Sequence, residues 1–167
     1  MHHRSASALL LFSFLGAPAF AADLPARAPG LWQSITSALG PDGQPLPNAQ
    51  NVISVSCVDA QNDQKFFLTE ADACTGLAVS GAGGSYHITA QCMESSGVHQ
   101  LNETLTYQDA KDVTLKAVYE TRAGQMTITS QLQWQGACLP GMQPGDEGSI
   151  INGSFSKADN INDPDNR

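Results

Sequence analysis

The sequence predicts a mainly β protein: an antiparallel meander with one short helix and two disulfide bonds. Three observations support this prediction. Apolar and polar residues alternate through the middle of the chain with a period of two, which is typical of half-buried strands. Turn-forming residues separate these stretches at short intervals. Four cysteines, Cys57, Cys74, Cys92 and Cys138, follow a segment that resembles an export signal. The pattern leaves open whether the sheet is a partly closed barrel or a two-layer sheet.

The first 21 residues have the composition of a secretory signal peptide. A short basic start, His2–Arg4, precedes the apolar run Leu9–Leu15, which has the length of a signal core and is far shorter than the ~20 residues that span a bilayer. Small residues at Ala19 and Ala21 predict cleavage after Ala21, with Ala22 as the alternative. We therefore expect a protein that is exported by this signal peptide. No later stretch is long and apolar enough to predict a membrane span.

Charge and length restrict the function of the mature chain. Cleavage leaves 167 − 21 = 146 residues, the size of one domain. Without Arg4 the chain carries seven Lys and Arg against 16 Asp and Glu, a net charge of 7 − 16 = −9. No Lys/Arg cluster is present, so nucleic acid is not an expected partner, because its binding needs concentrated positive charge.

The β patterning is confined to residues 22–140, which we expect to form a single domain. The acidic segment 141–167 is rich in Gly, Pro, Asn and Ser, and this composition predicts a disordered tail. Ile150, Ile151 and Phe155 are the residues of this tail that would dock if it formed a short extra strand.

Two strands and a helix are expected before the meander. Leu31–Leu39 and Val52–Val58 have the composition of strands. Their connector, Gly40–Asn51, contains three prolines and is expected to be an irregular loop. Lys65–Ala73 has a helical pattern that lasts for two turns.

A hairpin containing two of the cysteines is expected next. Thr75–Ser80 is a short strand, Gly81-Ala82-Gly83-Gly84 is a turn by composition, and Ser85–Met93 alternates as the returning strand. If the turn is centred near residue 83, Cys74 and Cys92 lie directly opposite each other, because 74 + 92 = 2 × 83. Directly opposed strand residues are close enough for a disulfide.

The other two cysteines pair by elimination. Four cysteines allow three pairings, and the hairpin selects Cys74–Cys92, which leaves Cys57–Cys138 to tie the early strands to the end of the meander. Zinc binding and thiol exchange are the alternatives. They are disfavoured because the closest cysteines are 17 residues apart and no CxxC pair exists. No metal or cofactor is therefore expected.

Three strands complete the meander: Val98–Gln108, Val113–Arg122 and Met126–Gln135. A turn at residues 94–97 precedes the first of them. A three-residue loop at Asp109–Lys111 aligns Tyr107 with Val113. A two-residue loop at Ala123-Gly124 pairs residues whose numbers sum to 247, so that Val113 faces Trp134.

The order of these motifs resembles a known family. Pro29-Gly30-Leu31-Trp32 opens the domain, the cysteines follow around a Gly-rich turn, and Gly136-Ala137-Cys138 closes it. This pattern is similar to the domain of unknown function 3617, a group of small exported bacterial proteins, over about residues 28–139. The resemblance implies export to a Gram-negative periplasm and an antiparallel β domain. It implies no activity and no catalytic residues.

Glu103 is the most unusual single residue, because it lies between Leu101 and Leu105 on the predicted inward face, near Ala117. A buried carboxylate must be paired or neutralised. We expect a twist or bulge of the strand to carry Glu103 to solvent. The alternative is that Glu103 is a polar anchor inside a ligand cavity.

The sequence contains little that indicates catalysis. No nucleophile elbow, metalloprotease or phosphate-loop motif is present. We therefore expect a non-catalytic module that binds a small apolar ligand or an envelope protein. The alternative is a hydrolase that uses scattered carboxylates, such as Glu103 with Asp109 or Asp112.

Overall fold

The computed structural model describes residues 22–72, 74–94, 97–121 and 124–163. The predicted signal peptide lies outside these residues. Nine strands and one helix follow one another in the order β1 (Gly30–Leu39), β2 (Val52–Val58), α1 (Lys65–Asp72), β3 (Cys74–Ala82), β4 (Ser85–Glu94), β5 (Gly97–Asp109), β6 (Asp112–Thr121), β7 (Gly124–Gly136), β8 (Asp146–Ile151) and β9 (Ser154–Asn160). Within the described ranges, no helix is both long and apolar enough to cross a membrane.

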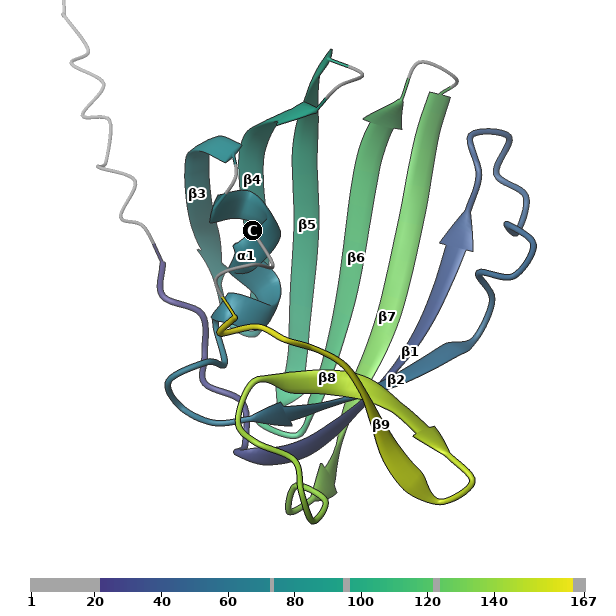
Figure 1. Cartoon of the computed structure of the whole chain (residues 1–167). Helices are drawn as coiled ribbons and strands as arrows, with labels where there is room; N and C mark the ends of the chain where they lie inside the picture. Colours follow the sequence, from purple (N-terminus) through teal and green to yellow (C-terminus); the bar gives the residue numbers. More distant parts are fainter. Residues whose placement is uncertain (1–21, 73, 95–96, 122–123, 164–167) are drawn as a thin grey trace, which may run out of the picture.

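The nine strands form one antiparallel sheet in the order β3-β4-β5-β6-β7-β1-β2-β8-β9 (Figure 1). The sheet is not closed, and β3 and β9 lie at its edges. The mainly β antiparallel prediction is confirmed. The meander runs only from β3 to β7, because β1 returns to pair with β7 and β2 pairs with β8.

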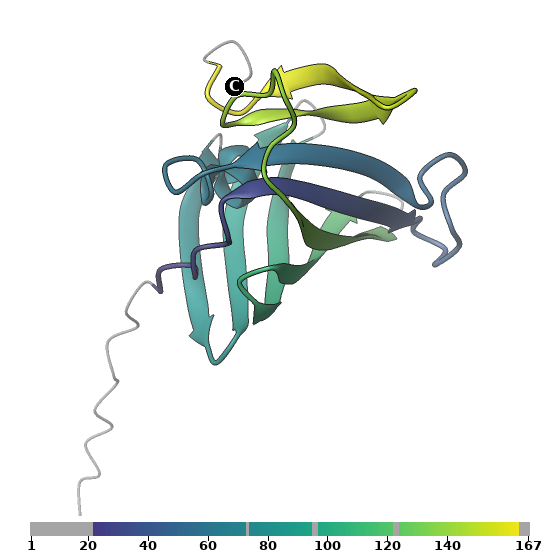
Figure 2. The same ribbon diagram turned by 90° about the horizontal axis from the view of Figure 1, so that it is seen from below.

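The sheet bends strongly, so that β1 and β2 run across the ends of β3–β6 (Figure 2). We define its inner face as the one that carries the core residues Trp32, Ile88, Leu105 and Val113, all less than 2% exposed. The helix α1 packs near β3 and β4 and adds Phe67 to this core. The segment before β1 adds Leu24. The helix and this segment therefore cover one half of the inner face.

The β6–β7 register differs from the prediction by two residues. Val113 faces Leu132 rather than Trp134, and the last pair is Thr121 with Gly124. The loop consists of residues 122–123, which lie outside the described ranges. A shift of two leaves every side chain on its original face, so alternation alone cannot distinguish the two registers.

Two other registers agree with the sequence. Tyr107 faces Val113 in the β5–β6 pair, as predicted. Cys74 faces Cys92 in the β3–β4 pair, although the turn is centred half a residue later than predicted, because Ala82 pairs with Ser85. A bulge between Thr75 and Ala78 corrects the offset, and Gly76 within it has a φ of +69°, a conformation that favours glycine.

Both disulfides join the pairs that the sequence predicts. Cys57 bonds Cys138 with a Cα–Cα distance of 5.5 Å, and Cys74 bonds Cys92 at 4.2 Å. The first fixes β2 to the chain that leaves β7, and the second joins two neighbouring strands.

The tail prediction is wrong for most of its length, because residues 146–160 form the β8–β9 hairpin. Asp146, which is 2% exposed, organises this region. Its carboxylate accepts hydrogen bonds from the Gln143 backbone N–H at 2.8 Å and the Asn160 amide at 2.8 Å, and it forms an ion pair with Lys157 at 2.6 Å. Burial raises the pKa of Asp146, but these hydrogen bonds outweigh it, and the pKa lies below its ordinary value.

Candidate functional site

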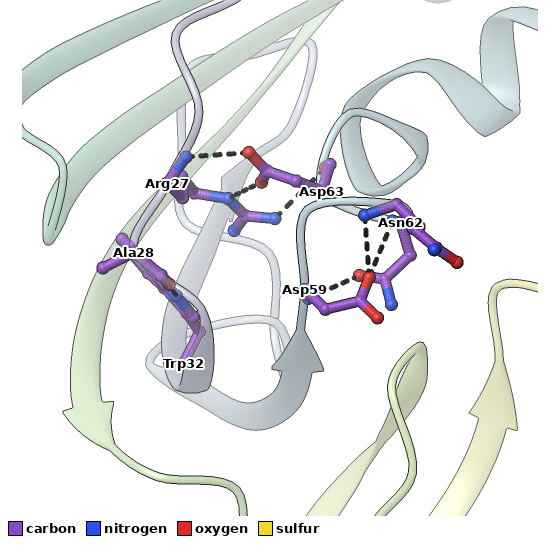
Figure 3. Close-up of polar contacts among 7 residues, drawn as sticks. Arg27, Ala28, Trp32, Asp59, Asn62 and Asp63 are labelled. Atoms are coloured by element: carbon purple, nitrogen blue, oxygen red, sulfur yellow. Dashed lines mark hydrogen bonds and ion pairs between the residues drawn. The ribbon is translucent and has the colours of Figure 1, made fainter.

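A buried polar centre lies where the segment before β1 meets the loop between β2 and α1 (Figure 3). The loop between β2 and α1 forms a tight, hydrogen-bonded turn before the helix begins. The Asp59 carboxylate accepts hydrogen bonds from the backbone N–H groups of Gln61 at 2.9 Å and Asn62 at 3.0 Å. The Asn62 side-chain oxygen accepts one in return from the Asp59 N–H at 3.0 Å. This Asx-type turn holds Asp63 in a fixed position.

Asp63 binds Arg27 through both its side chain and its backbone. One carboxylate oxygen accepts the Arg27 Nε–H at 2.6 Å, and the other accepts the Arg27 backbone N–H at 2.7 Å. The Arg27 Nη2 donates to the Asp63 carbonyl at 3.4 Å. The Arg27 side chain is 0% exposed and the Asp63 side chain is 5% exposed. The ion pair is therefore shielded from water and from salt.

Aromatic rings surround the Arg27 guanidinium. Its central carbon lies 4.4 Å from the Phe67 ring centroid, 4.9 Å from Trp32 and 5.4 Å from Phe66. These distances are within the range of cation–π interaction. Burial lowers the pKa of Arg27, and Asp63 opposes this effect. The centre joins the N-terminal segment, β1 and α1 at one point.

Tyr107 completes the centre from β5. Burial raises the pKa of Tyr107 above its ordinary value, and the nearby Asp63 carboxylate raises it further. The Tyr107 hydroxyl and the Arg27 Nη1 are both buried without a hydrogen-bond partner among the described residues. Neither a guanidinium nor a phenol with a raised pKa exchanges protons readily near neutral pH. The centre is suited to holding elements together rather than to acid–base catalysis.

Sequence reasoning missed this centre. Arg27 is one of few basic residues in an acidic chain, and it stands three residues before the Gly30-Leu31-Trp32 motif. That position was the only feature of the sequence that could have pointed to Arg27. The partner Asp63 is 36 residues away, and nothing in the spacing links the two.

Glu103 is buried, with 7% exposure, so the expectation that it reaches solvent is wrong. The strand is regular at this point: Glu103 faces Ile88 on β4 and Ala117 on β6 in unbroken registers. The bulge that would have carried the side chain outward does not exist there. Glu103 therefore lies on the inner face, as its alternation with Leu101 and Leu105 requires.

The inner face over β6, β7 and β1 carries a half-buried strip, which we call the inner strip. Its apolar members are Leu115, Tyr119, Met126, Ile128 and Leu132. Hydroxyl groups lie beside them: Thr36 Oγ1 and Ser130 Oγ are 2.8 Å apart, and Ser34 Oγ is 3.4 Å from Thr36 Oγ1. Ser130 faces Leu115 on one side and Thr36 on the other. The inner strip thus combines an apolar surface with a few fixed polar groups.

The structure does not bring Glu103 close to the other two candidate hydrolase carboxylates. Asp109 and Asp112 face each other at the β5–β6 turn. Glu103 is six residues from Asp109 along the same strand, about 20 Å at the rise of a β-strand. Paired glycosidase carboxylates lie about 5–9.5 Å apart.

The His87 Nδ1 lies 3.1 Å from the Thr104 hydroxyl on the exposed face of the sheet. Among the described residues, no group of three or more His, Cys, Asp or Glu side chains is arranged to hold a metal ion.

Comparison with known proteins identifies a family to which most of the domain matches. A family model described as "Protein of unknown function (DUF3617)" matches residues 27–138. The match begins at Arg27 and ends at Cys138, so it contains the buried centre, Glu103, the inner strip strands and all four cysteines. It excludes β8 and β9. Neither a curated protein nor a solved structure shows significant similarity to the chain.

Proposed function

The chain belongs to the DUF3617 family, whose description names no activity, and we propose that it is an exported, non-catalytic module that binds a small apolar ligand on the inner strip. The observation that carries the proposal is the composition of this strip. Five half-buried apolar side chains share the inner face with the hydroxyl pair Thr36–Ser130. Ligand sites commonly combine a largely apolar surface with a small number of placed polar groups.

The position of α1 supports this assignment. The helix and the N-terminal segment pack on the half of the inner face near β3 and β4, and the Arg27–Asp63 ion pair anchors them there. The inner strip lies over β6, β7 and β1: Leu115 and Leu132 at its near end pack against the core, and Met126 and Ile128 lie farther along β7. A rigid sheet that is covered on one half presents the remaining half as a preformed surface, which reduces the entropy cost of binding.

Glu103 would serve as the polar anchor of this site. It occupies the same face as the strip, two strands from Ile128 in the row Glu103, Ala117, Ile128. The small side chain of Ala117 separates Glu103 from the strip. A ligand with an apolar body and a polar end fits this arrangement better than a purely aliphatic one.

Export is supported by the disulfides. Both bonds join cysteines of the family-matched region, and disulfides persist chiefly in oxidising compartments such as the periplasm. We place the protein there as part of the same proposal.

Binding of the neutral apolar dye N-phenyl-1-naphthylamine tests the proposed surface. We expect saturable fluorescence enhancement with the oxidised protein, and at least tenfold weaker binding in Met126→Lys. The matched control is Thr127→Lys, because Thr127 neighbours Met126 but lies on the opposite face, and its affinity should stay within twofold. Native mass spectrometry of protein purified from its own periplasm should show a bound small molecule. Equal effects of the two substitutions, or no dye binding and no co-purified molecule, would refute the proposal.

A further inference from the structure

Strands β2 and β8 pair over only two residue pairs and then separate. The pairs are Val55 with Gly148 and Ser56 with Glu147. Continuing the register would place Ile53 opposite Ile150 and Val52 opposite Ile151, but these pairs do not form. Figures 1 and 2 both show the turn of the β8–β9 hairpin standing away from the start of β2. In the described part of the chain, both facing edges therefore lack a strand partner here.

The diverging ends carry four exposed β-branched residues. Val52 and Ile53 are 47% and 55% exposed, and Ile150 and Ile151 are 47% and 55% exposed. Val52 faces Thr36 on the inner face, whereas Ile53 shares the outer face with the buried Val55. By the same alternation, Ile151 lies on the inner side and Ile150 on the outer side. Apolar side chains thus flank the opening on both faces.

A groove lies between the turn of the β8–β9 hairpin and the chain that follows Cys138. It has a volume of about 420 Å³ and is lined by Leu139, Pro140, Gly141, Gly153, Ser154 and Phe155. Phe155 faces Ile150 across the hairpin. No charged side chain lines the groove. Ser154, which also lines the groove, pairs with Ile151. We call the opening and the groove together the hairpin site.

Charges flank the hairpin site at the other end of β8. Glu147 and Asp159 face each other directly, and Lys157 is committed to Asp146 at 2.6 Å. Residues 146–160 carry one Lys against three acidic residues, a net charge of 1 − 3 = −2. Like charges that are directly opposed in a sheet are unfavourable. Asp159 raises the pKa of Glu147 and Arg27 opposes this effect, but the pKa remains raised. A basic group brought alongside would add to the compensation that Arg27 supplies.

We propose that the hairpin site binds an extended, apolar segment of a partner protein, flanked by basic residues, which adds as a strand at the facing edges of β2 and β8. Free strand edges require backbone N–H and C=O groups, which an extended polypeptide supplies. The alternating side chains of such a strand meet Ile53, Ile150 and the groove on one face, and Val52 and Ile151 on the other. The acidic end of the hairpin accepts the basic flank. The site is formed largely by residues outside the family match of 27–138, so it extends the function beyond ligand binding on the inner strip.

A labelled peptide tests this site in the oxidised, full mature chain. The probe is fluorescein-labelled Lys-Val-Thr-Val-Thr-Val-Lys, followed by fluorescence anisotropy. We expect saturable binding that weakens at least tenfold in Ile53→Lys and in Ile150→Lys. Leu77→Lys is the matched control, because Leu77 is 41% exposed on β3, at the opposite edge of the sheet, and its affinity should remain within twofold. Far-ultraviolet circular dichroism and non-reducing mass analysis check that every variant is folded and oxidised.

Two further peptides separate strand addition from simple adhesion. Methylating alternate backbone nitrogens removes hydrogen bonds along one edge and should weaken binding at least tenfold. Replacing both lysines by glutamate should also weaken it at least tenfold at low salt. Binding of the methylated peptide as tight as that of the parent, equal loss in Leu77→Lys, or no saturable binding at all would each overturn the proposal.

Discussion

Replacing Asp63 by Asn should lower the free energy of unfolding by about 3 kcal/mol, because the substitution leaves a buried guanidinium without its counter-charge. The magnitude follows from the contacts. The Asp63 carboxylate accepts two charge-assisted hydrogen bonds from Arg27, at 2.6 and 2.7 Å, and each bond of this type contributes roughly 1.5–3 kcal/mol. Asn retains one acceptor oxygen, so part of this energy is preserved. Removing one partner of a buried pair typically costs about 3–5 kcal/mol.

Urea unfolding at pH 7, followed by tryptophan fluorescence under oxidising conditions, measures this loss. The melting temperature should fall by about 10 °C, since 1 kcal/mol shifts it by roughly 2–4 °C in domains of this size or somewhat larger. Lys65→Met is the control, because it removes an exposed 2.8 Å hydrogen bond to Asn162 near the same loop. Its cost should stay below about 1 kcal/mol.

A double-mutant cycle decides whether the ion pair itself is responsible. Arg27→Met should be costly in the wild-type background and much less so when Asp63 is already Asn, giving a coupling energy above about 1.5 kcal/mol. Additive losses, or an Asp63→Asn variant as stable as Lys65→Met, would refute the reasoning. The centre would then be a packed junction in which the charge is incidental.

Three further outcomes follow from the same structure. Removing the Cys57–Cys138 bond, which closes 81 residues, should lower the free energy of unfolding by about 4.5 kcal/mol. Removing the Cys74–Cys92 bond, which closes 18, should lower it by about 3 kcal/mol. The reverse order in urea unfolding would contradict the chain-entropy argument. Burial raises the pKa of Tyr107, so the folded state keeps it protonated, and stability should fall as pH rises above about 10, the ordinary tyrosine value. Tyr107→Phe should reduce this alkaline loss of stability. The substitution should cost little at pH 7, since the hydroxyl has no hydrogen-bond partner among the described residues. Burial and the facing Asp159 raise the pKa of Glu147, so Glu147→Gln should stabilise the protein at pH 7. The gain in stability should vanish below about pH 4, where Glu147 is protonated in both the folded and the unfolded state. A gain that persists in acid would indicate a packing effect instead.

Local patterns predicted strands β1–β7 but not every register, and they missed β8 and β9. Alternation assigns each residue to a face, and it placed Val113, Leu115 and Trp134 correctly inward. The β6–β7 loop contains two residues in either register, so loop length does not distinguish the two registers. In the observed sheet, Trp134 pairs with Trp32 on β1. The cysteine hairpin was predicted correctly for a partly different reason, because the bulge at Gly76 compensates for the later turn.

The candidate sites depended on contacts between distant segments. Glu103 was identified from its position in an apolar row, but its burial depends on unbroken pairing with both neighbouring strands. The Arg27–Asp63 pair joins residues 36 positions apart that belong to neither a repeat nor a motif. The inner strip exists because α1 covers one half of the sheet and leaves the other, which no periodicity in the sequence reports.

The order of the tail has a physical cause that composition does not record. Its low apolar content predicts disorder when the segment is treated as a free chain. The Cys57–Cys138 bond, however, fixes the start of this segment against β2, and the Gly145 N–H donates to the Cys57 carbonyl at 2.8 Å. Tethering shortens the loop that must be closed before β8 reaches the edge of β2, so fewer favourable contacts are needed to order it. Asp146 then supplies those contacts through Gln143, Asn160 and Lys157.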